Sequence, residues 1–151
     1  MEIRKALPAD AEAISTLLGL YGRKGLLLPR TVEELLENIR DFFVCTENGA
    51  FLGCCALKIY DAGLGEIRSL AVAESGRGQG CGRALVEACE GDARAFGIGR
   101  TFALTYIPGF FAKLGYAEVE KETLPQKIWR DCFKCIHFPN CGETAVVKTL
   151  R

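Results

Sequence analysis

The chain has 151 residues, with 19 Lys and Arg side chains balancing 19 Asp and Glu side chains. Such a chain is long enough to bury an ordinary core, and we expect a single domain over residues 1–151. The balanced charge gives no net positive field, so neither nucleic acid nor a membrane surface is an expected partner. No apolar run approaches the roughly 20 residues that span a bilayer, and the N-terminal MEIRKALPADAEA lacks signal-peptide character. We therefore expect a cytoplasmic protein.

The first third of the chain predicts one strand and two helices. The segment EIRKAL, residues 2–7, is typical of a strand, and Asp10 is a candidate N-cap for the helix that follows. The apolar side chains of that helix recur at spacings of three, four and seven. They are Ile14, Leu17, Leu18 and Tyr21. After the irregular GRKGLLLPR, Thr31 and Glu34 have the spacing of a capping box, which predicts a second helix.

The rest of the chain predicts strands that alternate with helices. FFVCTENGAFLGCCALKIY reads as two strands joined at Asn48-Gly49, a dipeptide typical of tight hairpins. The loop DAGLG leads to the strand EIRSLAVA, a glycine-rich loop and a helix over residues 82–96 with an apolar stripe. RTFALTY and AVVKTL predict later strands, and GFFAKLGY a short helix that ends at Gly115. This order favours an α+β or α/β domain around one mixed sheet.

The glycine-rich loop SGRGQGCG has the composition of an anion site. A strand, a glycine turn and a helix N-terminus bring free backbone N–H groups together, and the helix dipole adds partial positive charge. No glycine is followed by Lys and Ser or Thr, which excludes a P-loop, and Arg83 stands where a dinucleotide fingerprint needs its third glycine. What remains is Arg77-x-x-Gly80-x-Gly82, in which the backbone can approach a pyrophosphate. The alternative is a flexible surface turn that ends in a helix cap.

The succession EIRSLAV, RGQGCGRALVEAC and FALTYIPGFFAKLGY resembles the GNAT family of acetyl-CoA-dependent N-acetyltransferases. The resemblance covers most of the chain. It implies a three-layer α+β fold whose mixed, mostly antiparallel sheet has a V-shaped splay, with helices on its flanks. It also implies acetyl-CoA as co-substrate, with the pantetheine arm paired to the strand backbone as an added strand. The implied acetyl-CoA-binding residues are Leu70, Ala71, Val72, Arg77, Gly78, Gln79, Gly80, Cys81, Gly82, Arg83 and Phe111.

A narrower resemblance points to the acetyltransferase domain of N-acetylglutamate synthases. It rests on the order of the stretches GLLLPRTVEEL, CCALKIY, GEIRSLAV and ETLPQKIW. It implies an amino-acid acceptor, L-glutamate above all, and hence a role in arginine biosynthesis. Glutamate carries two carboxylates, so its pocket needs cationic groups, for which Arg can bind in a bidentate way. Arg30 and Lys58 match the family, Arg68 is placed to face the same cleft, and Lys127 is a weaker candidate.

The resemblance implies direct attack of a neutral amine on the thioester in a ternary complex. Glu66 stands where many members keep a carboxylate that takes the amine proton, directly or through water. Phe111 occupies the position where many members have a tyrosine that acts as the acid for the leaving thiolate, which leaves Tyr106 as a candidate acid. Cys81 has no His nearby in sequence, which disfavours covalent catalysis by cysteine.

Alternative functions remain open at this point. The chain is compatible with acetylation of another small amine or of a protein amine, and with a non-catalytic acyl-CoA-binding or zinc-stabilised interaction module. The sequence leaves the oligomeric state open, with a homodimer among the options.

The eight cysteines fall into two groups. Five lie among apolar residues, where a reduced thiol behaves as a small hydrophobe. They are Cys45, Cys54, Cys55, Cys81 and Cys89. The others, Cys132, Cys135 and Cys141, surround His137 in a set that would suit a structural zinc ion. Their spacing is tight and a distant second pair is absent, so we expect a thiol-rich loop, free or oxidised, rather than metal.

Overall fold

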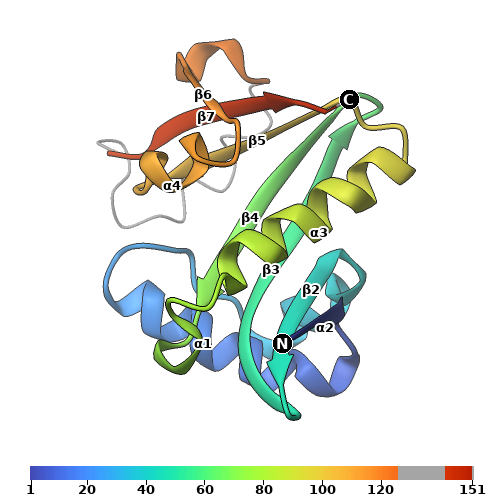
Figure 1. Cartoon of the computed structure of the whole chain (residues 1–151), viewed down its shortest axis with the longest axis vertical. Helices are drawn as coiled ribbons and strands as arrows, with labels where there is room; N and C mark the ends of the chain where they lie inside the picture. Colours follow the sequence, from blue (N-terminus) through green and yellow to red (C-terminus); the bar gives the residue numbers. More distant parts are fainter. Residues whose placement is uncertain (126–141, 151) are drawn as a thin grey trace.

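The computed structural model describes residues 1–125 and 142–150, which form one sheet with helices on both faces (Figure 1). The strands are β1 (Glu2–Lys5), β2 (Phe42–Glu47), β3 (Ala50–Asp61), β4 (Leu64–Val72), β5 (Arg100–Thr105), β6 (Ala117–Val119) and β7 (Thr144–Thr149). The helices are α1 (Ala11–Arg23), α2 (Val32–Glu37), α3 (Cys81–Ala95) and α4 (Pro108–Ala112). Lys127 and the Cys132, Cys135, His137 and Cys141 cluster lie outside the described residues. Within the described ranges, no helix is long and apolar enough to cross a bilayer.

The sheet has the order β1-β2-β3-β4-β5-β7-β6, and β4–β5 is its parallel pair. These two strands pair over a short stretch, from Leu64 opposite Arg100 to Glu66 opposite Phe102. Beyond it, β4 continues to Val72 on a diverging course, so the sheet opens into a V (Figure 1). The expected mixed, mostly antiparallel sheet with a splay is confirmed. The splay exposes backbone groups of β4 that a neighbouring strand would otherwise pair.

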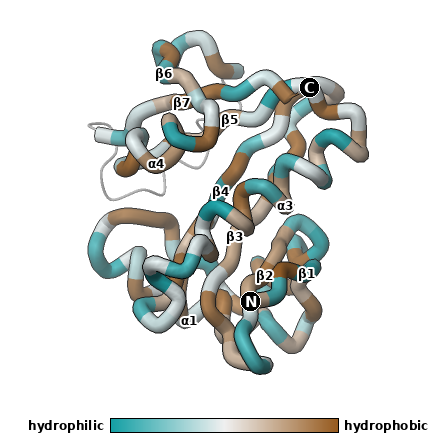
Figure 2. The backbone as a smooth tube through the Cα atoms, in the orientation of Figure 1, coloured by the Kyte–Doolittle hydropathy of each residue, from teal (hydrophilic) through white to brown (hydrophobic). Residues whose placement is uncertain are grey.

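The two faces of the sheet bury separate apolar cores. Because side chains alternate along a strand, neighbouring residues enter different cores. Val44 and Cys54 pack toward α1 and α2, whereas Cys45 and Cys55 pack toward α3. Brown, apolar stretches follow the central strands in Figure 2, which agrees with this burial on both faces. The five cysteines of the first group are free thiols buried in these cores, as the sequence indicated.

Two local predictions are confirmed in detail. Thr31 and Glu34 form the capping box of α2, in which the Glu34 amide donates to Thr31 Oγ1 at 3.1 Å. Asn48 and Gly49 both have positive φ, 51° and 81°, and close the β2–β3 hairpin. That conformation at two successive residues is what a type I′ turn requires.

The structure also differs from the expected elements. The first strand ends at Lys5, and the Asp10 carboxylate does not cap α1. It instead accepts from the Arg4 guanidinium at 2.8 Å and from the Leu7 amide at 2.7 Å, so it is already engaged when the helix begins. The strand β6 was not expected, because three residues are too few to show a periodicity.

Candidate functional site

The strand β4 carries a bulge beside the splay. Ala56 pairs with Arg68 and Cys54 pairs with Ala71, so one residue of β3 faces two residues of β4. At the bulge, Ser69 has φ 55°, a conformation uncommon for a residue other than glycine. The bulge breaks the alternation of the strand, and Arg68 and Ser69 both face cavities instead of the core.

The glycine-rich loop connects β4 to α3. Gly80 is the N-cap of α3 and has φ 78°, as Gly78 does, so both positions use the left-handed region that favours glycine. The Ala84 amide makes the first backbone bond of the helix, to the Gly80 carbonyl. The amides of residues 81–83 therefore precede the bonded ladder and are available to an anion. Gly82 lies in this first turn, where an added Cβ would meet the Phe110 ring at 3.4 Å.

The side chains in and next to the loop differ in their contacts and in their burial. Arg77 ends the short turn after β4, and Gln79 donates from Nε2 to the Ser75 carbonyl. Arg83 pairs with Glu87 on the exposed surface of α3 at 3.2 Å, a type of pair that contributes little stability. Cys81 is buried, and its burial raises the pKa of the thiol to about 12. A thiol that stays protonated at neutral pH is a poor nucleophile, which agrees with the sequence argument against covalent catalysis.

A cleft of about 550 Å³, including its opening to solvent, occupies the splay. We call it the splay cleft; residues 67–70 of β4 and residues 103–107 line its two sides. Tyr21 and the apolar segment between α1 and α2, coloured brown in Figure 2, contribute a further wall. Of the expected residues, Arg68, Leu70, Tyr106 and Phe111 line this cleft. Phe111 is buried and makes edge-to-face contacts with Phe110 and Tyr116, so its ring is fixed in place.

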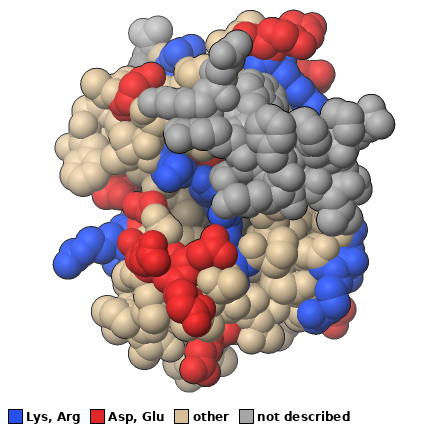
Figure 3. Space-filling view, turned by 180° about the vertical axis from the view of Figure 1, so that it is seen from behind, with Lys and Arg blue, Asp and Glu red and all other residues tan. Residues whose placement is uncertain are grey.

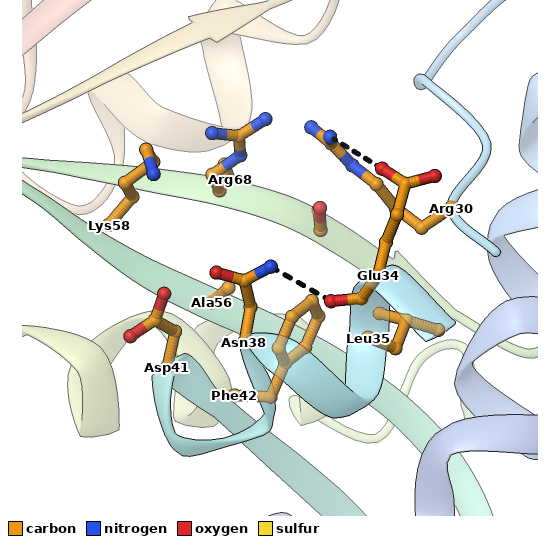
Figure 4. A pocket seen from close by; sticks show the side chains of 10 residues that line it. Arg30, Glu34, Leu35, Asn38, Asp41, Phe42, Ala56, Lys58 and Arg68 are labelled. Atoms are coloured by element: carbon orange, nitrogen blue, oxygen red, sulfur yellow. Dashed lines mark hydrogen bonds and ion pairs between the residues drawn. The ribbon is translucent and has the colours of Figure 1, made fainter. Parts of the chain in front are cut away.

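A second cavity, of about 510 Å³, opens on the face of the sheet that carries α1 and α2. We call it the cationic pocket, because Arg30, Lys58 and Arg68 all line it, as Figure 4 shows. These side chains come from three places: the segment before α2, β3 and β4. In Figure 3, Lys and Arg side chains gather in the hollow of this face, with Asp and Glu side chains beside them. The sequence-predicted acceptor residues are therefore brought together.

The cations of the pocket have acidic neighbours. Arg30 lies 3.8 Å from the Glu34 carboxylate, and Arg68 lies 3.7 Å from the Glu66 carboxylate. The Arg30 and Arg68 side chains are only 16% and 14% exposed, so their charges are poorly screened by water. Lys58 approaches the Tyr60 ring at 5.9 Å. The pocket thus holds three cations beside the Glu34 and Asp41 carboxylates, in a partly dry setting.

Glu66 is 8% exposed and lies opposite Lys58 in the β3–β4 register. Its carboxylate accepts a hydrogen bond from the Tyr60 hydroxyl at 3.2 Å, besides its contact with Arg68. Two neighbours therefore hold this carboxylate in a fixed orientation on the same strand as the bulge. Tyr106 follows β5 on the other side of the splay, and its hydroxyl is buried.

Three further residues were missed by sequence reasoning. Asn38 and Asp41 follow α2 and line the cationic pocket opposite the cations (Figure 4). Burial raises the pKa of the Asp41 carboxyl, and the positive charge of Lys58 opposes that rise. Ser69 lines both the cationic pocket and the splay cleft. Polar residues at a helix end and one serine in a strand are ordinary, and nothing in their spacing indicated a site.

The splay cleft and the cationic pocket adjoin each other. Arg68, which precedes the bulge, and Ser69, which lies in it, line both cavities. A molecule that lies in the splay cleft with its anionic end at the glycine-rich loop would reach the bulge with its other end. There it would meet a negatively charged molecule held by the cationic pocket. The arrangement suits a two-substrate transfer between an extended anionic donor and an anionic acceptor.

Comparison with known proteins identifies the donor chemistry. Residues 15–116 match the model of the acetyltransferase (GNAT) family. The chain belongs to this family. It is an acetyl-CoA-dependent N-acetyltransferase, and acetyl-CoA is its co-substrate. An uncharacterized N-acetyltransferase of Chlorobaculum tepidum is 49% identical over 98% of this chain and 96% of its own length.

Two further similarities concern the acceptor. An amino-acid acetyltransferase of Mycobacterium tuberculosis is 36% identical over 78% of this chain and 69% of its own length. The crystal structure of N-acetylglutamate synthase from Neisseria gonorrhoeae, complexed with coenzyme A and N-acetyl-glutamate, superposes with a TM-score of 0.90 at 30% identity. That similarity covers 99% of this chain but 35% of the synthase chain, so the two proteins share one part of the larger molecule.

Proposed function

We propose that this GNAT acetyltransferase transfers the acetyl group of acetyl-CoA to the α-amino group of L-glutamate, and that it thereby serves arginine biosynthesis. The observation that carries the proposal is the cationic pocket, in which Arg30, Lys58 and Arg68 converge. This pocket shares Arg68 and Ser69 with the splay cleft. Support also comes from the relatives named as amino-acid acetyltransferases and from the likeness to the gonococcal synthase.

The charges of the pocket favour a dicarboxylic acceptor over a simple amine. The three positive side chains outnumber the Glu34 and Asp41 carboxylates of the same lining, which disfavours a cationic amine, whereas glutamate presents two carboxylates to the cations. Arg30 suits a bidentate contact with one carboxylate, and Lys58 supplies a point charge for the other. Arg68, at the junction of the two cavities, would orient the acceptor so that its α-amino group faces the splay.

The donor side relies on backbone groups of this chain. Acetyl-CoA supplies a thioester whose carbonyl carbon accepts the amine. The amides of residues 81–83 would hold the pyrophosphate at the positive end of α3, with Arg77 as an added cation. The backbone of residues 70–72 would pair with the pantetheine arm, and an N–H group there would stabilise negative charge on the carbonyl oxygen.

Proton transfer would fall to Glu66 and Tyr106. Glu66 is already held by Tyr60 and Arg68, and it would take a proton from the α-ammonium group of the acceptor, directly or through water, so that the neutral amine can attack the thioester. Tyr106, across the splay, is the candidate that returns a proton to the departing thiolate. Direct attack in a ternary complex needs no covalent enzyme intermediate, which is consistent with a buried, protonated Cys81.

An acceptor panel tests this proposal. Release of the CoA thiol from acetyl-CoA would be followed with glutamate, glutamine, aspartate, a polyamine and a peptide N-terminus. We expect glutamate to have the highest kcat/KM. Glutamine is the informative competitor, because Asp41 could accept a hydrogen bond from its side-chain amide. A higher kcat/KM for any other acceptor would refute the glutamate assignment.

A further inference from the structure

The hydroxyl of Tyr21 is bound to both backbone groups of Val72. It donates to the Val72 carbonyl at 2.8 Å and accepts from the Val72 amide at 3.4 Å. Tyr21 lies in α1, 51 residues earlier in the chain, and its ring lines the splay cleft. The Tyr21 hydroxyl oxygen thus lies beside Val72, at the end of β4, the strand that the splay exposes.

These groups of Val72 are the ones that face away from β3. The Ala73 amide donates to the Leu52 carbonyl of β3 at 2.8 Å, and Ala71 is paired with Cys54 of the same strand. Because the direction of N–H and C=O groups alternates along a strand, those of Val72 point to the side that β5 has left. An oxygen in contact with both groups of one residue must lie beside the strand, in the plane of the sheet. That is where the backbone of a next strand would lie.

We propose that Tyr21 caps the donor-binding edge of β4 and must release Val72 before acetyl-CoA can pair with that edge. An arm that pairs with Val72 as an added strand needs the position that the phenol oxygen holds. The Tyr21 hydroxyl is therefore a competitor of the co-substrate, built into the first helix. The inference rests on the acetyl-CoA chemistry of the family, and it is independent of which acceptor the enzyme uses.

The contacts of Tyr21 keep the free-energy cost of replacing it by the co-substrate small. The amide contact is long, at 3.4 Å, so one strong bond to the carbonyl is what binding must replace. Leu26 and Leu27 line the same cleft, so apolar side chains lie near the path of the ring when the tyrosine side chain turns away from the strand. Loss of one net hydrogen bond in the free protein corresponds to a change of about two- to tenfold in affinity.

The test is calorimetric titration of Tyr21→Phe with CoA in the absence of any acceptor. We expect the Kd for CoA to fall by about two- to tenfold, while the Tm of the free protein falls because a hydrogen bond is lost. An unchanged or weaker affinity for CoA would overturn the proposal, because a purely structural tyrosine lowers Tm without tightening the co-substrate. Omission of the acceptor keeps this result separate from the glutamate assignment.

Tyr116→Phe is the matched control. The Tyr116 hydroxyl is bound to Glu90 and Thr101, both at 2.8 Å, on the other side of the sheet from Tyr21. This variant also loses buried hydrogen bonds, and we expect a lower Tm with no gain in affinity for CoA. An equal gain in both variants would refute a specific role of Tyr21, since it would reflect general loosening.

Discussion

The splay cleft and the cationic pocket meet at the bulge of β4, yet they are built by different means. The proposed donor side relies on backbone conformation, in the left-handed Gly80 and in the strand edge at Val72 that Tyr21 contacts. The proposed acceptor side, the cationic pocket, presents charged side chains that three separate elements contribute. Backbone recognition suits a co-substrate that is common to a whole family, because it does not depend on particular side chains. Side-chain recognition suits the acceptor, which can change when a few residues change.

The largest expected effect on the donor side comes from a side chain introduced at Gly80. Gly80→Val forces a β-branched residue into φ 78°, although an added Cβ would meet no protein atom within 4 Å. We expect the amides of the first turn to lose their arrangement and the Kd for CoA to rise by about a hundredfold or more, with the fold retained. Calorimetric titration and circular dichroism measure the two effects. Gly91→Ala, in the same helix and with open space around it, should leave the affinity intact.

Persistent binding of CoA by Gly80→Val would mean that the loop is only a flexible turn. The donor side would then depend on other groups, and the contrast between backbone and side-chain recognition would fail.

The second prediction concerns Glu66, the proposed base, which contacts Arg68 where the two cavities meet. Glu66→Gln keeps the shape of the carboxylate but cannot take a proton, so we expect kcat to fall by about a hundredfold or more. The amide can still contact Tyr60, and the Kd for CoA should stay within about twofold, no more than the smallest effect expected of a lost hydrogen bond. Pre-steady-state kinetics would separate chemistry from product release. A kcat close to that of the parent enzyme would assign the proton transfer to another group.

Sequence reasoning succeeded where the determinants lie within a few residues. The Asn48-Gly49 turn and the Thr31–Glu34 capping box are local, and the structure confirms both. The order of strand, glycine-rich loop and helix around Gly80 is equally local. Such local determinants are what a sequence pattern records, whereas the binding roles expected of the donor-side residues stay predictions.

What the sequence could not predict depends on contacts between distant segments. The Tyr21 contact with Val72 joins residues far apart in the chain, and the spacing of Tyr21 indicated only a core-facing helix residue. The bulge at Ser69 arises from the register between β3 and β4, which no single strand encodes. Asp41 was missed because its role follows from its position opposite Lys58. The resemblance therefore pointed to three residues that line one cavity, Arg30, Lys58 and Arg68, and their role in binding the acceptor stays a prediction.

A prediction of intermediate size sharpens the acceptor side. Arg30→Ala removes a largely buried guanidinium from the cationic pocket and should raise the KM for glutamate by about tenfold or more. The KM for acetyl-CoA should change little, because Arg30 does not line the splay cleft. Initial rates at varied concentrations of each substrate distinguish the two effects. Arg94→Ala, on the exposed side of α3, is the control for loss of one positive charge. An unchanged KM for glutamate would remove Arg30 from the acceptor site.

The smallest expected effect comes from Asp41, the acidic group opposite the cations. Because burial raises the pKa of its carboxyl, the folded protein holds that proton more tightly than the unfolded chain does. Stability is therefore lost as the pH rises through the folded pKa, and Asp41→Asn should be the more stable protein at neutral pH but not in acid. Thermal unfolding of both proteins from acidic to neutral pH measures the difference in Tm between them.

The same substitution acts on the acceptor in the same direction. Asp41→Asn removes a negative charge that repels a bound dicarboxylate, so the KM for glutamate should fall by about two- to fivefold at low ionic strength. The gain should shrink as salt is added, because the pocket is open to solvent on one side. A raised KM would show instead that Asp41 accepts a hydrogen bond from the acceptor. That result would favour an amide-bearing amino acid such as glutamine, while the backbone-based donor side would stand unchanged.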